Sequence, residues 1–212
     1  MSKTTISIPR LKLGYANTVV VSASKVIIEG PALVGLVGAN GAGKTTLLQA
    51  MAGLLQPAEG VVKLNKQVVS LPQVRSRIIF VPDRPVLFND LSIIDTLKHV
   101  LKITGSTKPT PLGSALWKAF ELAPLERRFP SQLSRGQRQK AALAVAASRS
   151  ADVLLFDEPT IALDTEARAA LIKVLAEHAS EYLIIASSHD DAVADAANDI
   201  LRIKDGILTV WR

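Results

Sequence analysis

The chain has 212 residues, of which 48% are hydrophobic, and it contains no cysteine. The lack of cysteine excludes disulfides and cysteine-based metal sites. No apolar run approaches the ~18 to 20 residues that a membrane-crossing helix requires. The first ten residues also lack the apolar segment of a secretion signal. We therefore expect a globular protein that stays in the cytoplasm.

The formal net charge of +6 hides an asymmetry along the sequence. Residues 1–151 carry 20 basic and 7 acidic groups, whereas residues 152–212 carry 5 basic and 12 acidic groups. A basic excess of this kind permits binding to nucleic acid, to anionic lipid or to a phosphate ligand, and it equally fits a solvated basic face. Charge alone does not choose among these interpretations.

The apolar pattern predicts an α/β fold. Residues 3–28 and 61–69 are β-branched with a period of two, which indicates an antiparallel sheet beside the core. Short runs that are apolar on both faces of the pleat are typical of a parallel sheet covered by helices. Such runs cover residues 32–38, 78–82, 153–158 and 182–187, and helical patterns cover residues 44–52, 92–103, 136–148 and 165–179.

The remaining segments complete the predicted architecture. From about residue 85 to residue 150 the helices are interrupted by TGSTKPTPLG and RRFPSQ, which indicates a helical insert between two core strands. Further on, ILRIKDGILTV predicts a hairpin with Asp205 and Gly206 at the turn. The expected fold is a mainly parallel sheet with helices on both faces, an N-terminal antiparallel β subdomain and an inserted helical subdomain.

The stretch GANGAGKTT, residues 38–46, matches the phosphate-loop pattern G-x-x-x-x-G-K-[ST] and stands between an apolar strand and a helix. Glycines let backbone N–H groups turn toward a phosphate chain, and the helix N-terminus adds roughly half a positive charge. Lys44 is expected to reach the β- and γ-phosphates, and Thr45 to bind Mg²⁺. The residues expected around the nucleotide are Asn40, Gly41, Gly43, Lys44, Thr45 and Thr46.

The run VLLFDE ends in two adjacent carboxylates, Asp157 and Glu158. Asp157 is expected to hold Mg²⁺ through its water shell. Glu158, one residue further along, is placed to orient and deprotonate a water that attacks the γ-phosphate. Together with the phosphate loop, this strand predicts a nucleoside triphosphatase.

These motifs belong to a larger set, through which almost the whole chain resembles the nucleotide-binding subunit of an ATP-binding cassette (ABC) transporter. GANGAGKTT resembles the Walker A loop, LSRGQ the family signature, and VLLFDE the Walker B strand. ALD at residues 162–164 resembles the D-loop, and SSHD the segment of the switch histidine, here His189. Tyr15 falls where the family places an aromatic residue that stacks on adenine. A signature of this type is far more specific than a phosphate loop alone.

The resemblance implies one ABC ATPase domain over residues 1–212. Residues 1–84 and 151–212 would form the nucleotide-binding core, and residues 85–150 the helical subdomain that carries the signature. His189 would contact the γ-phosphate and link Glu158 to the dimer partner.

The signature is expected to face a nucleotide bound to a different subunit. Ser134, Gly136 and Gln137 would approach the γ-phosphate of an ATP that a second cassette holds, so that two ATP molecules are shared in a head-to-tail dimer. Because each motif occurs once in the chain, the second cassette is expected on another polypeptide, either an identical or a related chain.

Three positions depart from the family pattern. Arg135 replaces the usual first glycine of the signature pair, and Ile161 stands where a serine is more common. Asp83, in FVPDRPVLF, takes the place of a glutamine that reaches Mg²⁺ or the attacking water. Aspartate is shorter and charged, and we expect it to keep a contact with the metal. Its context resembles a subset of cassettes paired with export-type or poorly characterised bacterial permeases.

The primary interpretation is an ATPase subunit that uses ATP and Mg²⁺ to drive a separate membrane permease from the inner face of the cell membrane. Export is favoured, and the cargo is left open. The apolar face of LSIIDTLKHVLKI would dock a permease helix or would simply pack in the core.

Two other classes of protein are weighed against this interpretation. The basic first two thirds prompt a soluble ABC-type switch that acts on nucleic acid or ribosomes, but the aromatic residues that single-strand stacking requires are not interleaved with the basic ones. Nucleic acid is therefore not the expected partner. A degenerate cassette that binds ATP without hydrolysis is the other alternative, and Lys44, Asp157, Glu158 and His189 argue against it.

Overall fold

The computed structural model describes residues 4–15, 18–189 and 191–211, apart from the side chains of Tyr15 and Asp191. These residues form two compact units. The first comprises Met1–Phe80, Ala151–Glu158 and Ala179–Arg212, and the second comprises Val81–Ser150 and Pro159–His178. The second unit thus contains Pro159–His178 in addition to the segment 85–150 that the sequence presents as an insert.

An 11-stranded sheet frames the first unit, with the order β6-β5-β1-β2-β11-β10-β3-β9-β8-β7 and with β4 paired to β1. Neighbours among β10, β3, β9 and β8 are parallel, whereas β1 and β2 form an antiparallel pair. The strands are β1 (Thr4–Tyr15), β2 (Thr18–Gly30), β3 (Ala32–Val37), β4 (Glu59–Gly60), β5 (Lys63–Leu64), β6 (Gln67–Val68), β7 (Ile78–Val81), β8 (Val153–Phe156), β9 (Leu183–Ser188), β10 (Asp199–Lys204) and β11 (Ile207–Trp211).

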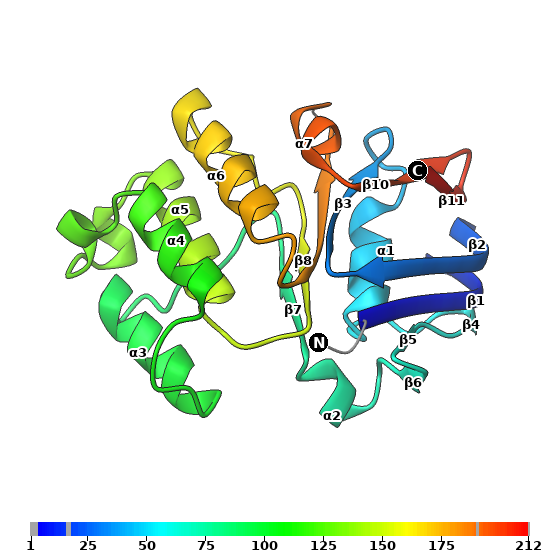
Figure 1. Ribbon diagram of the computed structural model, residues 1–212, viewed down its shortest axis with the longest axis horizontal. Coiled ribbons are helices and arrows are strands. Elements are labelled where there is room, and N and C mark those ends of the chain that lie inside the picture. The colour runs from blue at the N-terminus through cyan, green and yellow to red at the C-terminus, as the bar shows by residue number, and fades with distance from the viewer. Residues whose placement is uncertain (1–3, 16–17, 190, 212) are drawn as a thin grey trace. The chain divides into compact units, whose positions relative to one another are not determined.

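The central parallel strands are buried on both faces because helices cover both sides of the sheet. Three helices belong to this unit: α1 (Lys44–Met51), α2 (Pro72–Arg75) and α7 (Asp191–Ala196). Leu47 and Met51 of α1 join the core cluster that includes Val34 of β3, and Figure 1 shows α1 alongside β1, β2 and β3. On the opposite face a Cβ on Gly35 would lie 3.4 Å from the Cα of Ala194 in α7.

The antiparallel strands expected beside the core continue the same sheet. The β10–β11 hairpin makes the connection, since β10 pairs with β3 while Ile207 of β11 pairs with Ser22 of β2. Asp205 and Gly206 occupy its turn with φ of 51° and 73°, as the sequence predicts. The backbone N–H of Ser22 donates to the carbonyl of Gly206 at 2.7 Å, which fixes the turn against β2.

The second unit is helical. It contains α3 (Ile93–Ile103), α4 (Pro111–Ala119), η1 (Ala123–Leu125), η2 (Pro130–Gln132), α5 (Arg135–Ala147) and α6 (Thr165–Glu177). Helix α4 begins inside TGSTKPTPLG, which the sequence pattern presents as a break. The Thr110 hydroxyl caps this helix by accepting from the N–H of Gly113 at 3.1 Å, and Pro111 fits the first helical position.

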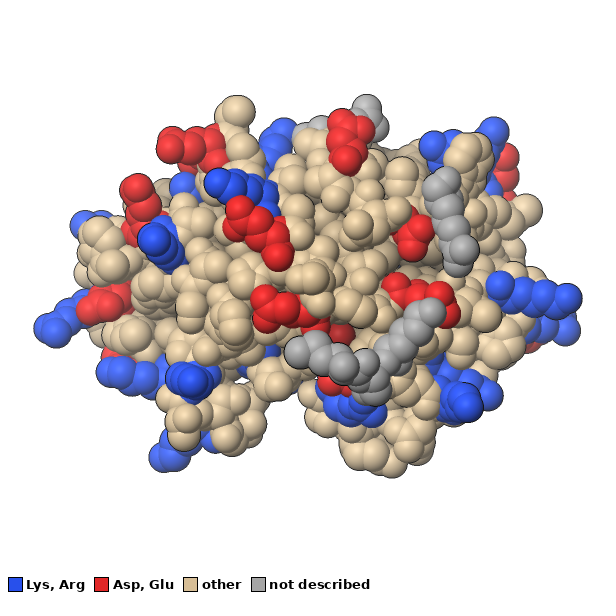
Figure 2. Space-filling model, viewed as in Figure 1, with Lys and Arg blue, Asp and Glu red and all other residues tan. Residues whose placement is uncertain are grey.

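Two surface features of the described residues bear on the sequence expectations. No helix among them is both long and apolar enough to cross a membrane. On the face drawn in Figure 2, the described Lys and Arg side chains are interspersed with Asp and Glu side chains. The excess of basic residues therefore does not form a single positively charged patch on that face.

Candidate functional site

The phosphate loop connects β3 to α1 and contains two glycines in the left-handed backbone region. Gly41 has a φ of 77° and Gly43 a φ of 98°. A Cβ on Gly43 would lie 2.8 Å from Cγ1 of Val20, so a larger residue meets both backbone strain and a steric clash. Gly43 precedes α1 without a side-chain cap, which leaves the first N–H groups of the helix for a ligand.

Lys44 is buried beneath this loop and has two partners. Its Nζ donates to the carbonyl of Gly38 at 2.8 Å and lies 3.3 Å from Oε1 of Glu158. Its side chain is 7% exposed, so the ion pair is shielded from water. The predicted phosphate-binding lysine and the predicted general base therefore contact each other directly.

Asp157 is held by two hydroxyl groups. The Thr45 hydroxyl donates to Oδ2 at 2.6 Å, and the Ser187 hydroxyl donates to Oδ1 at 2.7 Å. Ser187, which is fully buried, also accepts from the backbone N–H of Glu158 at 2.9 Å. The sequence analysis missed Ser187. A signal for it was the pair of serines, Ser187 and Ser188, that follows the apolar residues 183–186.

Glu158 sits at the end of β8 with a φ of 47°, a conformation that is uncommon for a glutamate. The Glu158 carboxylate contacts both Lys44 and His189. One oxygen faces Lys44, and the other lies 2.7 Å from Nδ1 of His189. His189 is more than half exposed, at 55% of its side chain, while Glu158 is 13% exposed.

A cavity of about 280 Å³ in the first unit is lined by the phosphate loop and by both carboxylates. Its lining consists of Val20, Ala39, Asn40, Gly41, Gly43, Lys44, Thr45, Thr46, Asp157 and Glu158. All six loop residues predicted from the sequence thus share one cavity with both predicted carboxylates. Val20 of β2 lines it as well, which no local pattern predicts because Val20 is distant from the loop in the chain.

The oxygen donors suit a magnesium ion. Mg²⁺ usually keeps several waters and takes one or two carboxylates together with substrate phosphates. Thr45 and Asp157 bring a hydroxyl and a carboxylate together next to the phosphate loop, which fits that donor set. No larger cluster of His, Cys, Asp or Glu with metal-site geometry occurs in the described part of the chain.

The signature segment lies in the second unit, where Ser134 caps α5. The Ser134 hydroxyl accepts from the N–H of Gln137 at 3.1 Å, and the Gln137 side chain accepts from the N–H of Ser134 at 2.9 Å. A Cβ on Gly136 would lie 2.8 Å from the carbonyl of Ala162, so the glycine admits the D-loop of the same chain. The first turn of α5 contains no acidic residue.

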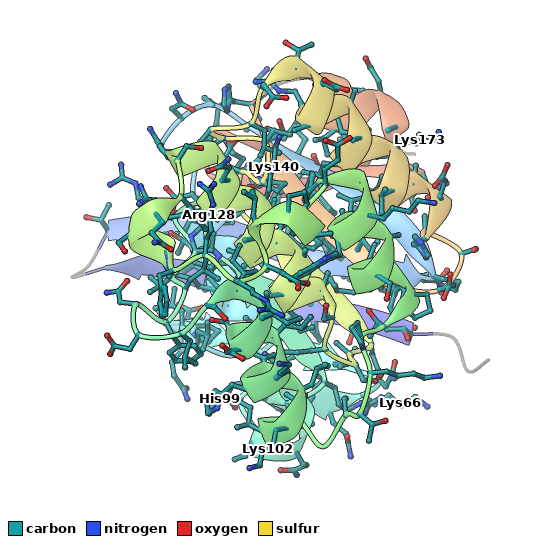
Figure 3. All side chains as sticks on the ribbon, turned by 90° about the vertical axis from the view of Figure 1, so that its left-hand side faces the viewer. Lys66, His99, Lys102, Arg128, Lys140 and Lys173 are labelled. Atoms are coloured by element: carbon teal, nitrogen blue, oxygen red, sulfur yellow. The ribbon has the colours of Figure 1, made fainter. Side chains whose placement is uncertain are left out.

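The D-loop aspartate, Asp164, caps α6 and pairs with the signature helix. It accepts from the N–H of Ala167 at 2.8 Å, and Nζ of Lys140, labelled in Figure 3, lies 3.2 Å away. The Ala167 N–H and then the Lys140 side chain hold the pKa of Asp164 below its usual value. The carboxylate thereby connects α5 to α6 within the helical unit.

Two further residues predicted for the site are Asp83 and Tyr15. Asp83 belongs to the second unit, has a side chain that is 47% exposed, and lies 3.8 Å from Nε of Arg84. The side chain of Tyr15, predicted to stack on adenine, lies outside the described residues.

The fold and this cavity are those of the P-loop nucleoside triphosphatase fold class. The sequence profile of the family described as "ABC transporter" matches residues 23–161. The chain belongs to this family. It is also similar to a solved dimeric ATP-binding cassette in a post-hydrolysis state with ADP and Pi, with a TM-score of 0.81 and 22% identity over 99% of this chain and 98% of that one.

Two curated relatives are ATP-binding proteins of import systems. The sulfate/thiosulfate import protein CysA 1 of Rhizobium meliloti is 36% identical over 76% of this chain and 49% of its own length. The putative 2-aminoethylphosphonate import protein PhnT of Salmonella choleraesuis is 33% identical over 96% of this chain and 57% of its own length. The chain spans about half the length of these relatives. Their names give no support to the expected preference for export.

Proposed function

We propose that the chain is the ATP-hydrolysing subunit of an import-type ABC transporter. The observation that carries this proposal is the buried contact of Lys44 with Glu158, flanked by the Thr45–Asp157 pair in a cavity of about 280 Å³. In the free chain the Glu158 carboxylate neutralises Lys44. A bound triphosphate replaces it at Lys44 and leaves the carboxylate for a water molecule.

The chemistry then follows from the positions of these groups. The loop from Asn40 to Thr46 binds the phosphates through backbone N–H groups, and Lys44 neutralises their charge. Glu158 accepts a proton from a water whose oxygen forms a bond to the γ-phosphorus. The bond from that phosphorus to the bridging oxygen breaks, and ADP keeps its electron pair. His189 holds the Glu158 carboxylate in place.

Thr45 and Asp157 would hold Mg²⁺, which when bound supplies positive charge to the phosphates. We further propose that Asp83 contributes to the metal site, as the sequence indicates. The variant Asp83→Gln tests this role through the Mg²⁺ dependence of turnover. An unchanged Mg²⁺ titration and an unchanged rate would show that Asp83 has no part in metal binding.

The signature would serve the ATP of a second cassette, identical or related, in a head-to-tail dimer. The Ser134 hydroxyl accepts from Gln137 and keeps its own proton free to donate to a phosphate oxygen. Gly136 and Gln137 would lie next to the same phosphate, and Tyr15 would stack on adenine. Both compact units are needed for this arrangement, so residues 1–212 would act as one ATPase domain.

The partner outside the dimer would be a separate membrane permease, which keeps the chain at the inner face of the membrane. The import names of the curated relatives favour uptake as the direction. Direction can be tested by coexpressing the chain with a candidate permease and following cargo accumulation in cells. Export of the cargo, or failure of the two proteins to copurify from membranes, would overturn this part of the proposal.

Glu158→Gln is the direct test of the enzymatic role. Loss of the general base should lower phosphate release by about 10²- to 10⁴-fold while ATP still binds. The variant should accumulate as a dimer with ATP, which size-exclusion chromatography can detect. A wild-type rate of phosphate release in this variant would rule out Glu158 as the base.

A further inference from the structure

A second cavity in the first unit is not used by the proposed reaction. Its volume is about 290 Å³, similar to that of the nucleotide cavity. It lies where the ends of β3, β9 and β10 meet the phosphate loop. Its lining consists of Val37, Gly38, Ser188, His189, Arg202, Ile203 and Lys204.

The charge of this cavity differs from that of the nucleotide cavity. Lys44 in the nucleotide cavity is balanced by Asp157 and Glu158, whereas the described lining of the second cavity has Arg202 and Lys204 and no carboxylate. Within the described ranges of the chain, neither of these cations forms an ion pair. The guanidinium carbon of Arg202 lies 4.6 Å from the centroid of the Trp211 ring, a stacking contact that restricts its position.

We propose that this cavity binds a small tetrahedral oxyanion of the phosphate class. Arginine presents a planar set of donors that matches two oxygens of such an anion, and lysine adds a compact point charge. Two positive charges match the charge of a dianion. The His189 imidazole contacts Glu158, and no Phe, Tyr or Trp on which a base could stack is among the described lining residues, so the recognised group is the anion rather than a base.

The cavity is linked to the reaction through His189. The imidazole lines the cavity and at the same time lies 2.7 Å from the carboxylate of Glu158. Gly38 also lines the cavity, while its carbonyl accepts from Lys44. An anion in the cavity attracts the exposed imidazole away from Glu158. Orthophosphate, a product of the proposed reaction, is therefore expected to slow turnover without competing with ATP. This expected inhibition rests on the proposed function, whereas the binding of the anion does not.

The binding test uses inorganic phosphate alone, titrated by calorimetry into the 212-residue chain without nucleotide. The background is Lys44→Ala, which weakens the phosphate loop as a competing site by removing its lysine. We expect saturable binding that weakens about tenfold in Lys204→Gln, the loss of one charge-assisted contact. Lys66→Gln removes one exposed charge elsewhere in the same unit and should leave binding unchanged. Absent binding, or equal binding in Lys204→Gln and its parent, would overturn the proposal.

The kinetic test separates the product of the reaction from phosphate supplied in the buffer. Lys204→Gln should retain the wild-type rate in phosphate-free buffer but lose the inhibition that added phosphate causes. Arg202→Gln serves as a second variant, with circular dichroism to check that the loss of the Trp211 contact leaves the fold intact. Inhibition that is the same in wild type and both variants would overturn the link to turnover. Because the binding test needs no ATP hydrolysis, its outcome is independent of the proposed enzymatic role.

Discussion

The two helices that begin at family motifs, α1 and α5, differ in how their first N–H groups are satisfied. Helix α1 follows Gly43 and has no side-chain cap, whereas α5 follows Ser134 and has a complete capping box with Gln137. Neither helix has an acidic residue in its first turn. Helix α1 therefore depends on a ligand to complete its N-terminus, and α5 is complete before any ligand arrives.

This difference assigns separate physical roles to the two motifs. The phosphate loop leaves its donors unsatisfied and neutralises Lys44 with a carboxylate that a nucleotide must displace, so binding reorganises it. The signature helix is already fixed, and a phosphate adds to its existing hydrogen bonds. We expect changes near α1 to affect nucleotide affinity most, and changes near α5 to affect stability and dimer formation.

Gly43→Ala should have the largest effect on nucleotide binding. A left-handed backbone costs a non-glycine residue about 1–2 kcal/mol, and the new Cβ would also press against Val20. ATP affinity, measured by calorimetry, should fall more than tenfold because the binding-competent loop becomes less populated.

Gly41→Ala is the matched control for that substitution. Its φ of 77° imposes a comparable backbone cost, but a Cβ at this position meets no atom within 4 Å. The affinity loss should therefore be smaller than for Gly43→Ala. An equal loss in both variants would show that steric packing against Val20 is unimportant.

Ser187→Ala should lower turnover about tenfold because the Ser187 hydroxyl holds both the Asp157 carboxylate and the backbone N–H of Glu158. The substitution leaves the N–H of Glu158 without its acceptor, a loss of about 1–3 kcal/mol for a buried group. As Ser187 also positions Asp157, the Mg²⁺ concentration for half-maximal turnover should rise. Ser22→Ala, which removes a hydroxyl that donates to Gly206, is the control. A shift of the same size in both variants would assign the effect to stability alone.

Local sequence predicted most of the residues that line the nucleotide cavity. The spacing from Gly38 to Thr45 and the apolar strand before Asp157 depend on residues that are close together in the chain. The helices predicted over 44–52 and 165–179 begin where the structure has them, since the phosphate loop before the first and the Asp164 cap before the second are also local.

Long-range packing determined the features that the sequence did not reveal. Ser187 meets Asp157 only because β8 and β9 are neighbours in the sheet. The sequence analysis assigns Gly136 to the nucleotide of a second cassette. It does not predict that the Ala162 carbonyl of the same chain approaches this glycine. Helix α7 is short and without an apolar period, so its position against Gly35 could not be predicted from its own residues.

Ser134→Ala should show the stability effect expected near α5. Loss of the cap lowers the free energy of unfolding by about 0.5–2 kcal/mol, measurable by urea denaturation. Thr110→Ala removes the cap of α4 and should destabilise the protein to a similar extent. In the Glu158→Gln background, ATP-dependent dimer formation should weaken only when Ser134 is changed. Equal weakening by Thr110→Ala would contradict a role for the signature in the dimer.

Asp164 gives the smallest effect, confined to acidic pH. The pKa of Asp164 is lowered in the folded state, first by the Ala167 N–H and then by Lys140. The charge of Asp164 therefore contributes fully to stability above the unfolded pKa of about 3.9. This contribution is lost as the pH falls through the folded pKa. Asn at this position still caps α6 but does not titrate. The difference in melting temperature between wild type and Asp164→Asn should therefore be constant near neutral pH and shrink below about pH 4. A difference that does not change with pH would show that the charge of Asp164 contributes nothing to the contact between α5 and α6.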